Sequence, residues 1–136
     1  MTDRAKRDRW RTVLAVLGVL LAGNGVWMLM STEGWFQSVA PDVAPFNLHF
    51  VRDVGAAYLT AGVALVWAGL RPLHRGPLVG VAALFLVLHA LGHVRETLSG
   101  DLGPQHWLED LPGVYAPAAF LLYAALRFLR APDSHT

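Results

Sequence analysis

Two histidines and a glutamate interrupt an apolar stretch of the sequence at residues 89–96, HALGHVRE. His89, His93 and Glu96 are spaced i, i+4 and i+7, so on a helix they share one face. Histidine is the commonest metal ligand in proteins, and two histidines one helical turn apart can bind a single ion. The spacing indicates a ligand-binding helix. The zinc-protease motif is absent, however, because Ala90 and not glutamate follows His89.

A second polar group lies at residues 47–59, NLHFVRDVGAAYL, where a histidine and an aspartate are again spaced i, i+4. Together the two stretches offer a mixed nitrogen and oxygen ligand set that suits zinc, iron or copper. A pair of histidines from different helices would instead ligate a haem iron. The predicted cofactor is therefore a transition metal or haem, and the predicted metal ligands are His49, Asp53, His89, His93 and Glu96.

Acid–base catalysis is the second interpretation of these residues. A histidine and a carboxylate in an apolar pocket can exchange protons with a bound substrate. With His93 and Asp53 as catalytic residues, the chain would be a membrane enzyme that isomerises, cyclises or hydrolyses a lipophilic substrate. Transport or proton relay would require an oligomer, because four short helices leave little room for a path.

A third interpretation gives the polar residues no chemistry at all. Charged side chains inside membrane helices usually face the bundle interior and pair with one another, which fixes the helix register. The expected pairs are Arg52 or Arg95 with Asp53 or Glu96, and the histidines with Asn24 or Tyr115.

Four apolar segments must position these residues, and each is close to the ~20 residues that cross the hydrocarbon core as a helix. Residues 12–22 and 78–88 lack the polar face that a helix of a soluble protein shows. The chain is 54% hydrophobic and only 15% charged. The sequence therefore predicts an all-α fold, an integral membrane four-helix bundle that forms a single domain over residues 1–136. The predicted spans are 11–30, 48–70, 77–98 and 113–130.

The basic residues predict how the chain crosses the membrane. Lysines and arginines cluster at residues 4–11, 71–75 and 127–130, which four spans place on one side. The positive-inside rule makes that side the cytoplasm. Loops 31–47 and 99–112 contain no lysine or arginine and are expected to face outward. Both termini are therefore predicted to be cytoplasmic, in a multi-pass protein of the inner (plasma) membrane.

This orientation gathers the polar residues in the outer half of the membrane. At 1.5 Å per residue, Asp53 and His93 lie about 7 Å below the outer end of their helices, Asn24 about 10 Å and His89 about 13 Å. Tyr115 begins the fourth span at the same side. We therefore expect a pocket that opens outward. The predicted cofactor-binding residues in it are Asn24, His49, Arg52 and Tyr115.

Glycines recur at heptad spacing on two of the segments. Gly55, Gly62 and Gly69 form a stripe on the second, and Gly18 and Gly25 form one on the first. Small residues let membrane helices approach closely. The second helix can therefore pack by its glycine face while His49 and Asp53 point into the pocket. The stripes also offer a surface for a homo-oligomer.

The loops and the net charge limit the classes of partner that the protein is expected to bind. Residues 31–39, STEGWFQSV, predict a short interfacial helix that begins at Ser31 or Thr32, and residues 101–112 predict another. His106 is expected to be exposed, or to lie over the pocket as a lid, and residues 131–136 to form a disordered tail. Membrane lipids and a lipophilic small molecule are the expected partners. The net charge of +1 gives no sign of nucleic-acid binding.

Three stretches carry a resemblance to a known group of proteins: FNLHFVRDVGAAYLTAGVAL at 46–65, LVLHALGHVRETL at 86–98 and GNGVWMLMSTEGWF at 23–36. The chain resembles small bacterial membrane proteins with four spans that are grouped with the DoxX-like families. The resemblance covers nearly the whole chain and implies a four-helix inner-membrane bundle, with a link to redox and thiol-stress systems. This chain has no cysteine, so a direct thiol role is excluded and a redox-accessory role is what the resemblance leaves.

Overall fold

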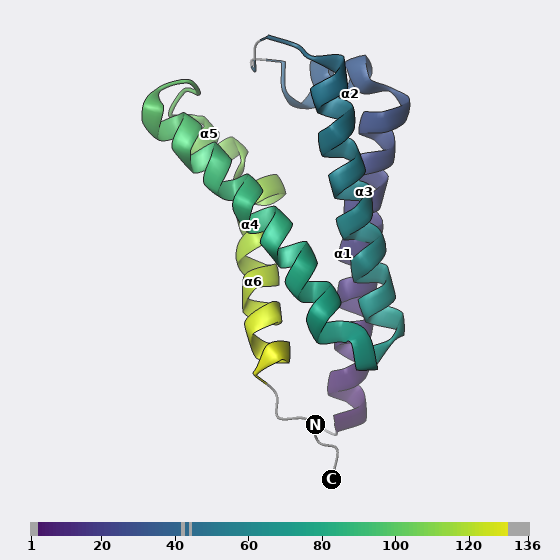
Figure 1. Ribbon diagram of the computed structural model, residues 1–136. Helices are drawn as coiled ribbons and strands as arrows, with labels where there is room; N and C mark the ends of the chain where they lie inside the picture. The colour runs from purple at the N-terminus through teal and green to yellow at the C-terminus, as the bar shows by residue number, and fades with distance from the viewer. Residues whose placement is uncertain (1–2, 42, 44, 131–136) are drawn as a thin grey trace. The chain divides into compact units, whose positions relative to one another are not determined.

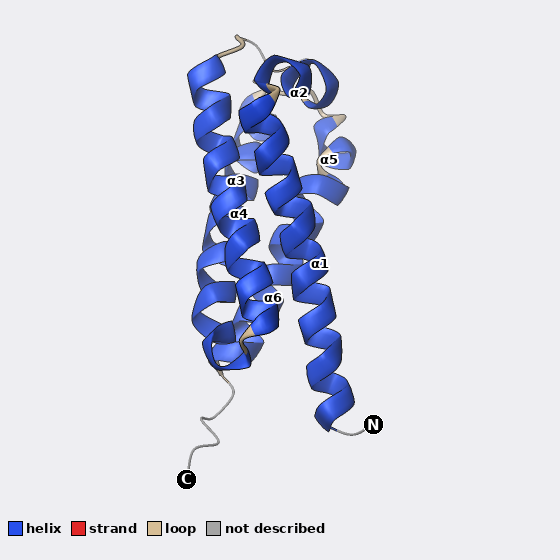
Figure 2. Cartoon of the chain, turned by 90° about the vertical axis from the view of Figure 1, so that its right-hand side faces the viewer, coloured by secondary structure: helices blue, strands red, loops and turns tan. Residues whose placement is uncertain are grey.

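The computed structural model describes residues 3–41, 43 and 45–130, and every regular element within these ranges is a helix. Figure 2 shows that only short loops separate the helices. The predicted all-α fold is confirmed, whereas the predicted disordered tail lies outside the described residues. In chain order the elements are α1 (Asp3–Met30), α2 (Thr32–Val39), α3 (Leu48–Leu70), η1 (Pro72–His74), α4 (Arg75–Ser99), α5 (His106–Glu109), η2 (Leu111–Tyr115) and α6 (Ala116–Leu129).

Four helices in the described part of the chain are long and apolar enough to cross a membrane. They match the four predicted segments and differ mainly at three starting residues. The first begins two residues earlier than predicted, at Arg9. The third begins five residues earlier than predicted, at Pro72, and the fourth two residues earlier, at Leu111. Prolines are well accommodated in a first helical turn, since the N–H that they lack has no partner there. The four stretches are Arg9–Met30, Leu48–Leu70, Pro72–Ser99 and Leu111–Leu129.

The chain divides into two compact units, residues 1–72 and residues 73–136. In the first unit α1 and α3 lie side by side, and α2 connects them at one end (Figure 1). In the second unit α4 packs against α6, and α5 and η2 lie in the connection between them. Each unit is thus a helical hairpin with a short helix in its connection. The single domain expected over residues 1–136 stays a prediction.

Glycines set the close packing of α1 against α3 in the first unit. A Cβ atom added to Gly18 would lie 2.7 Å from the carbonyl oxygen of Gly62, and one added to Gly25 would lie 2.6 Å from that of Gly55. Both distances are too short for any side chain. The predicted glycine-mediated contact is therefore confirmed between α1 and α3 of one chain. A homo-oligomer, which stays a prediction, would have to use another surface.

Alanines and leucines form the seam of the second unit. Leu86 of α4 and Leu121 of α6 are fully buried, and small residues around them let the helices approach. Arg75 begins α4 with its guanidinium carbon 5.6 Å from the centre of the Phe128 ring, a cation–π contact. The buried alanines of the seam are Ala82, Ala83, Ala90, Ala118, Ala124 and Ala125.

Both short helices predicted from the sequence are present, while their position at a membrane interface stays a prediction. Ser31 precedes the first residue of α2, although its hydroxyl makes no capping hydrogen bond. Within α2 the side chain of Gln37 donates a hydrogen bond to Glu33, at 3.3 Å. The second helix, α5, is a single turn that begins at His106.

Candidate functional site

A histidine and an aspartate of the second unit form the shortest side-chain ion pair in the described residues. Nδ1 of His93, on α4, lies 2.7 Å from Oδ2 of Asp110. The two side chains are only 22% and 14% exposed. A carboxylate accepts hydrogen bonds and an imidazole carries its proton on either nitrogen, so this contact places the proton on Nδ1. Nε2 of His93 is then the nitrogen with a free lone pair.

His89 lies one turn before His93 on the same face of α4, as the sequence predicts. The centres of the two rings are 4.7 Å apart, and the rings meet edge to face. The other side of the His89 ring stacks on Phe85 at 6.0 Å. An aromatic side chain on one side and an imidazole on the other hold His89 beside the His93–Asp110 pair.

His106 joins this group from α5, which excludes the exposed alternative for this residue, while the alternative that it lies over a pocket stays a prediction. Its side chain is only 12% exposed. Its Nδ1 lies 3.8 Å from Oδ2 of Asp110 and 3.8 Å from a carboxylate oxygen of Glu109. Asp110 therefore has one histidine in hydrogen-bond contact and a second within ion-pair distance. We call His89, His93, His106 and Asp110 the histidine–aspartate group.

Tyr115 and Thr97 border the histidine–aspartate group. The Thr97 hydroxyl donates a hydrogen bond to the backbone carbonyl of His93, at 2.9 Å. The Tyr115 hydroxyl is buried near Thr97 and Asp110, yet it forms no hydrogen bond of good geometry within the described part of the chain. Its ring stacks on Trp107 at 5.9 Å. Tyr115 thus brings a buried hydroxyl to the edge of the site, beside Thr97 and Asp110.

The end of α4 is fixed by a glycine. Gly100 has a φ of 84°, in the left-handed region that glycine adopts without strain. Beyond it the N–H of Leu102 donates to the carbonyl of Glu96, at 3.1 Å, and the Leu102 side chain is buried. This closure turns the chain back toward α4 and leads it to α5.

A wide helical turn positions Asp110 on the other side of the site. The carbonyl of Asp110 accepts the N–H groups of both Val114 and Tyr115, at 2.8 and 3.1 Å, so that η2 is wider than an α-helix. Pro117 lies just beyond and has no N–H to donate to the carbonyl four residues earlier. Wide turns of this kind occur at functional sites more often than elsewhere.

An apolar groove lies between α4 and α6 of the same unit. Its volume is about 180 Å³, and Tyr115 is its one residue with a polar side chain. Tyr115 therefore contributes to both the groove and the border of the histidine–aspartate group. The other lining residues are Val87, Ala90, Leu91, Val94, Ala118, Ala119 and Leu122.

The remaining predicted site residues on α3 lie in the first unit. Nε2 of His49 is 3.4 Å from Oδ2 of Asp53, and their side chains are 87% and 65% exposed. Within this unit Arg52 does not pair with Asp53. Its Nε donates instead to the hydroxyl of Thr32, at 3.2 Å. His49 and Asp53 therefore belong to a separate exposed pair, and their role in the predicted metal site stays a prediction.

Asn24 also has a partner that the sequence did not suggest. Its Oδ1 accepts a hydrogen bond from the indole Nε1 of Trp35, at 2.8 Å. Its amide nitrogen lies 3.7 Å from the sulfur of Met28. Within the first unit this hydrogen bond fixes α2 to α1, and the expected bond between Asn24 and a histidine stays a prediction. Glu96, the last predicted ligand, lies exposed on α4.

The arrangement of histidines and carboxylates in the described residues bears on the predicted metal site. In the parts of the chain that the structure describes, no three or more histidine, aspartate or glutamate side chains are arranged to hold one metal ion. The histidine–aspartate group contains residue types that bind metals, but its carboxylate, that of Asp110, is already hydrogen-bonded to His93. A metal or haem bound here would take a further ligand from elsewhere, so both cofactors stay predictions.

Asp110 is the residue of the histidine–aspartate group that the sequence interpretation missed. It lies in the predicted outer loop 99–112, between the third and fourth predicted spans. A signal was present, since a connection of about ten residues between antiparallel helices must bring its end back to the first helix. Asp110 directly precedes the fourth apolar segment, so it returns to the level of His93.

No family model, curated protein or solved structure matches the chain. The resemblance to DoxX-like proteins, and the redox-accessory role that it implies, therefore stay predictions.

Proposed function

We propose that the protein is an integral membrane protein that crosses the bilayer four times. Four helices of sufficient length and apolarity support this proposal. Many large apolar side chains on them are more than half exposed, which in water would leave a large apolar surface uncovered. Lipid would cover it. Examples are Val16, Val19, Leu20, Val81, Leu84 and Leu88.

We propose further that both termini face the cytoplasm. Within each unit, basic residues are concentrated at one end of the helical hairpin. In the first, Arg9, Arg11 and Arg71 lie at the end of the hairpin opposite α2. In the second, Arg127 and Arg130 lie at the end opposite α5. The connections at the other ends carry acidic and no basic residues. The positive-inside rule assigns the basic ends to the cytoplasm of a plasma membrane.

We infer that the outer end of the second unit binds a lipid-like small molecule, with its polar group at His93. The observation that carries this proposal is the 2.7 Å contact between His93 and Asp110. A histidine held by a carboxylate through Nδ1 presents Nε2 in a fixed direction and as a stronger acceptor. A hydroxyl or other donor of a ligand can bind there.

The surroundings of the pair favour a ligand with an apolar body. Leu88 and Leu91 are exposed on the surface of α4, and the groove between α4 and α6 is almost wholly apolar. A ligand dissolved in the bilayer reaches such a surface without crossing water. The buried Tyr115 hydroxyl offers a second polar contact at the edge of the groove.

Acid–base catalysis on the same ligand is the second candidate. A histidine oriented by a carboxylate is the arrangement that general bases use, since the carboxylate stabilises the imidazolium that forms when the histidine takes a proton. The His93–Asp110 contact has this geometry. In this role Asp110 takes the place that the sequence interpretation gave to Asp53.

The test is to identify what the purified protein carries. Wild type, His93→Ala, His89→Ala/His93→Ala and His49→Ala would be purified in mild detergent. Extracted lipids would be measured by mass spectrometry, metal content per chain by elemental analysis, and haem by its visible absorbance. Near-stoichiometric retention of one lipid-like molecule, lost in His93→Ala but kept in His49→Ala, is the expected result.

Other outcomes separate the alternatives. One metal or haem per chain, lost in the double variant, would replace the lipid proposal by the metal interpretation. A ligand that changes chemically with wild type and not with His93→Ala would establish the enzyme. A wild type without lipid, metal or haem, together with variants that only lose stability, would leave the polar group a structural network. Asp110→Asn tests the site where His93→Ala does not fold, because asparagine still accepts the hydrogen bond of Nδ1.

A further inference from the structure

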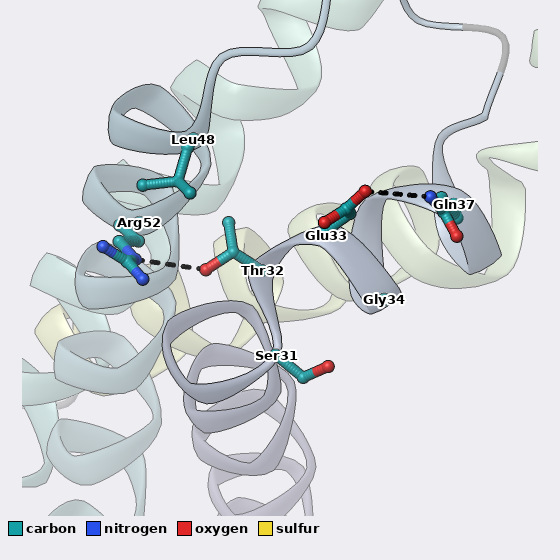
Figure 3. A pocket seen from close by; sticks show the side chains of 7 residues that line it. All are labelled: Ser31, Thr32, Glu33, Gly34, Gln37, Leu48 and Arg52. Carbon is teal, nitrogen blue, oxygen red and sulfur yellow. Dashed lines mark hydrogen bonds between the residues drawn. The ribbon is translucent and has the colours of Figure 1, made fainter.

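A second candidate binding region lies in the first unit, where α2 meets the beginning of α3. Here an open hollow of about 480 Å³ has walls that are polar and apolar in equal measure (Figure 3). Its volume exceeds that of the apolar groove in the second unit. We call it the α2–α3 hollow. Its lining residues are Ser31, Thr32, Glu33, Gly34, Gln37, Leu48 and Arg52.

Arg52 lies in a candidate membrane span and has no counter-ion within its own unit. Its Nε donates to the neutral hydroxyl of Thr32, and no carboxylate lies within ion-pair distance in the described part of residues 3–72. The Thr32 side chain is buried and holds the guanidinium at the hollow, as Figure 3 shows. Charged groups in membrane segments are retained where they are paired. The two Nη nitrogens of Arg52 therefore remain for a partner from outside the unit.

Glu33 provides the opposite charge in the same hollow without neutralising Arg52. Its carboxylate accepts a hydrogen bond from Gln37, one turn later on α2, and in Figure 3 the two side chains lie together on α2. A cation and an anion that line one cavity, and that do not pair with each other, are complementary to a ligand with both charges.

The position of the hollow along the helices identifies the class of ligand. Arg52 is one turn from Leu48, the first residue of α3, about 6 Å along the helix axis. In the orientation proposed above, the long side chain of Arg52 can extend from this depth toward the outer lipid headgroups. Guanidinium groups bind phosphate through two parallel hydrogen bonds, and lipid headgroups present a phosphodiester there. Leu48 supplies an apolar wall for the glycerol and upper acyl carbons.

We propose that the α2–α3 hollow binds the headgroup of a zwitterionic phospholipid of the ethanolamine type. The phosphodiester lies against the Nη nitrogens of Arg52, and the ammonium group lies against the carboxylate of Glu33. Backbone N–H groups in the first turn of α2 have no side-chain cap and provide further donors to the phosphate. The proposal depends on the membrane insertion proposed above, but not on the ligand at His93.

The experiment compares lipid affinities by native mass spectrometry of the full chain in detergent. Phosphatidylethanolamine and phosphatidylglycerol of equal acyl composition would be titrated separately. Wild type is expected to bind phosphatidylethanolamine more tightly. Arg52→Gln should weaken binding of both lipids about tenfold, because the charge-assisted hydrogen bonds to phosphate are lost. Glu33→Gln should abolish the preference between the two lipids while retaining phosphate binding.

Controls keep the outcome independent of folding and of the other site. Arg95→Gln removes an exposed arginine of α4 in the other unit and should leave both affinities unchanged. Arg52→Lys keeps the charge and should lose only part of the affinity, so it tests the site where Arg52→Gln does not fold. Circular dichroism would verify the helical content of each variant.

Three results would overturn the proposal. Wild-type affinity in a folded Arg52→Gln protein would exclude the phosphate contact. Equal binding of the two lipids by wild type would exclude the ammonium contact with Glu33. Displacement of the lipid by soluble glycerophosphoethanolamine at comparable concentration would assign the hollow to a free zwitterion instead of a membrane lipid. Extraction of the wild-type protein from membranes by alkaline carbonate would separately refute the insertion on which the proposal depends.

Discussion

His93 and Asp110 are 17 residues apart in sequence, yet their side chains meet at 2.7 Å and connect the C-terminal part of α4 to the residue that precedes η2. Their contact is charge-assisted and shielded, since both side chains are largely buried. The same two atoms can hold the hairpin together and orient a ligand-binding nitrogen.

A double-mutant cycle on His93→Ala and Asp110→Ala should give a coupling energy of about 1–2 kcal/mol in the free energy of unfolding. Hydrogen bonds to charged groups have energies of this size when they are shielded from water. Unfolding of the detergent-solubilised protein by sodium dodecyl sulfate, followed by circular dichroism, measures it. The matched control is His49 and Asp53, which have the same residue types at 3.4 Å but are exposed, and whose coupling should be within experimental error. Equal coupling energies for the two pairs would contradict the importance given to burial.

The absence of cysteine from the sequence makes the proposed topology directly testable. Single cysteines at Ser38 and Gln105 should react in intact cells with a maleimide that does not cross membranes. A cysteine at Leu73 should react only after the cells are permeabilised. All three positions are exposed, so a difference in labelling reports the side of the membrane and not burial. Labelling of Leu73→Cys in intact cells would reverse the orientation and, with it, the outer-leaflet position of the α2–α3 hollow.

The helices were predictable and the partners of the polar residues were not. Long apolar runs predict the helices because a backbone segment in lipid must satisfy its hydrogen bonds within itself. The apolarity of a segment can be read from the local sequence alone. The glycine contact was also predictable from a local pattern, because heptad spacing places Gly55 and Gly62 on one face of their helix. The partner of Arg52 was not, because it depends on how α2 folds back to bring Thr32 to α3. Asp110 escaped prediction because a wide turn and a glycine-terminated helix together decide where it lies.

Trp35 and Asn24 should make an energetic contribution that the sequence pattern does not reveal. Their hydrogen bond of 2.8 Å connects α2 to α1 and is partly buried. A cycle of Trp35→Phe and Asn24→Ala should give a coupling energy of about 1 kcal/mol. The same unfolding assay measures it. Trp27→Phe is the control, because Trp27 lies exposed on α1, and this variant should change the unfolding free energy by only a few tenths of a kcal/mol. A Trp27→Phe variant as unstable as Trp35→Phe would show that ring volume matters and not the hydrogen bond.

Gly18 should be a position of the first unit that cannot accept a larger residue while α1 and α3 stay in contact. Gly18→Ala places a Cβ 2.7 Å from both a backbone carbonyl oxygen and a backbone nitrogen of α3. Backbone atoms cannot move aside as a flexible side chain can, so α1 and α3 must separate and lose contact along their length. We expect a loss of about 1–3 kcal/mol in unfolding free energy, despite the higher helix propensity of alanine. Gly23→Ala makes the identical change on the same helix where no atom lies within 4 Å, and it should be neutral or slightly stabilising. Equal stabilities of the two variants would mean that α1 and α3 do not pack through their glycines in the folded protein.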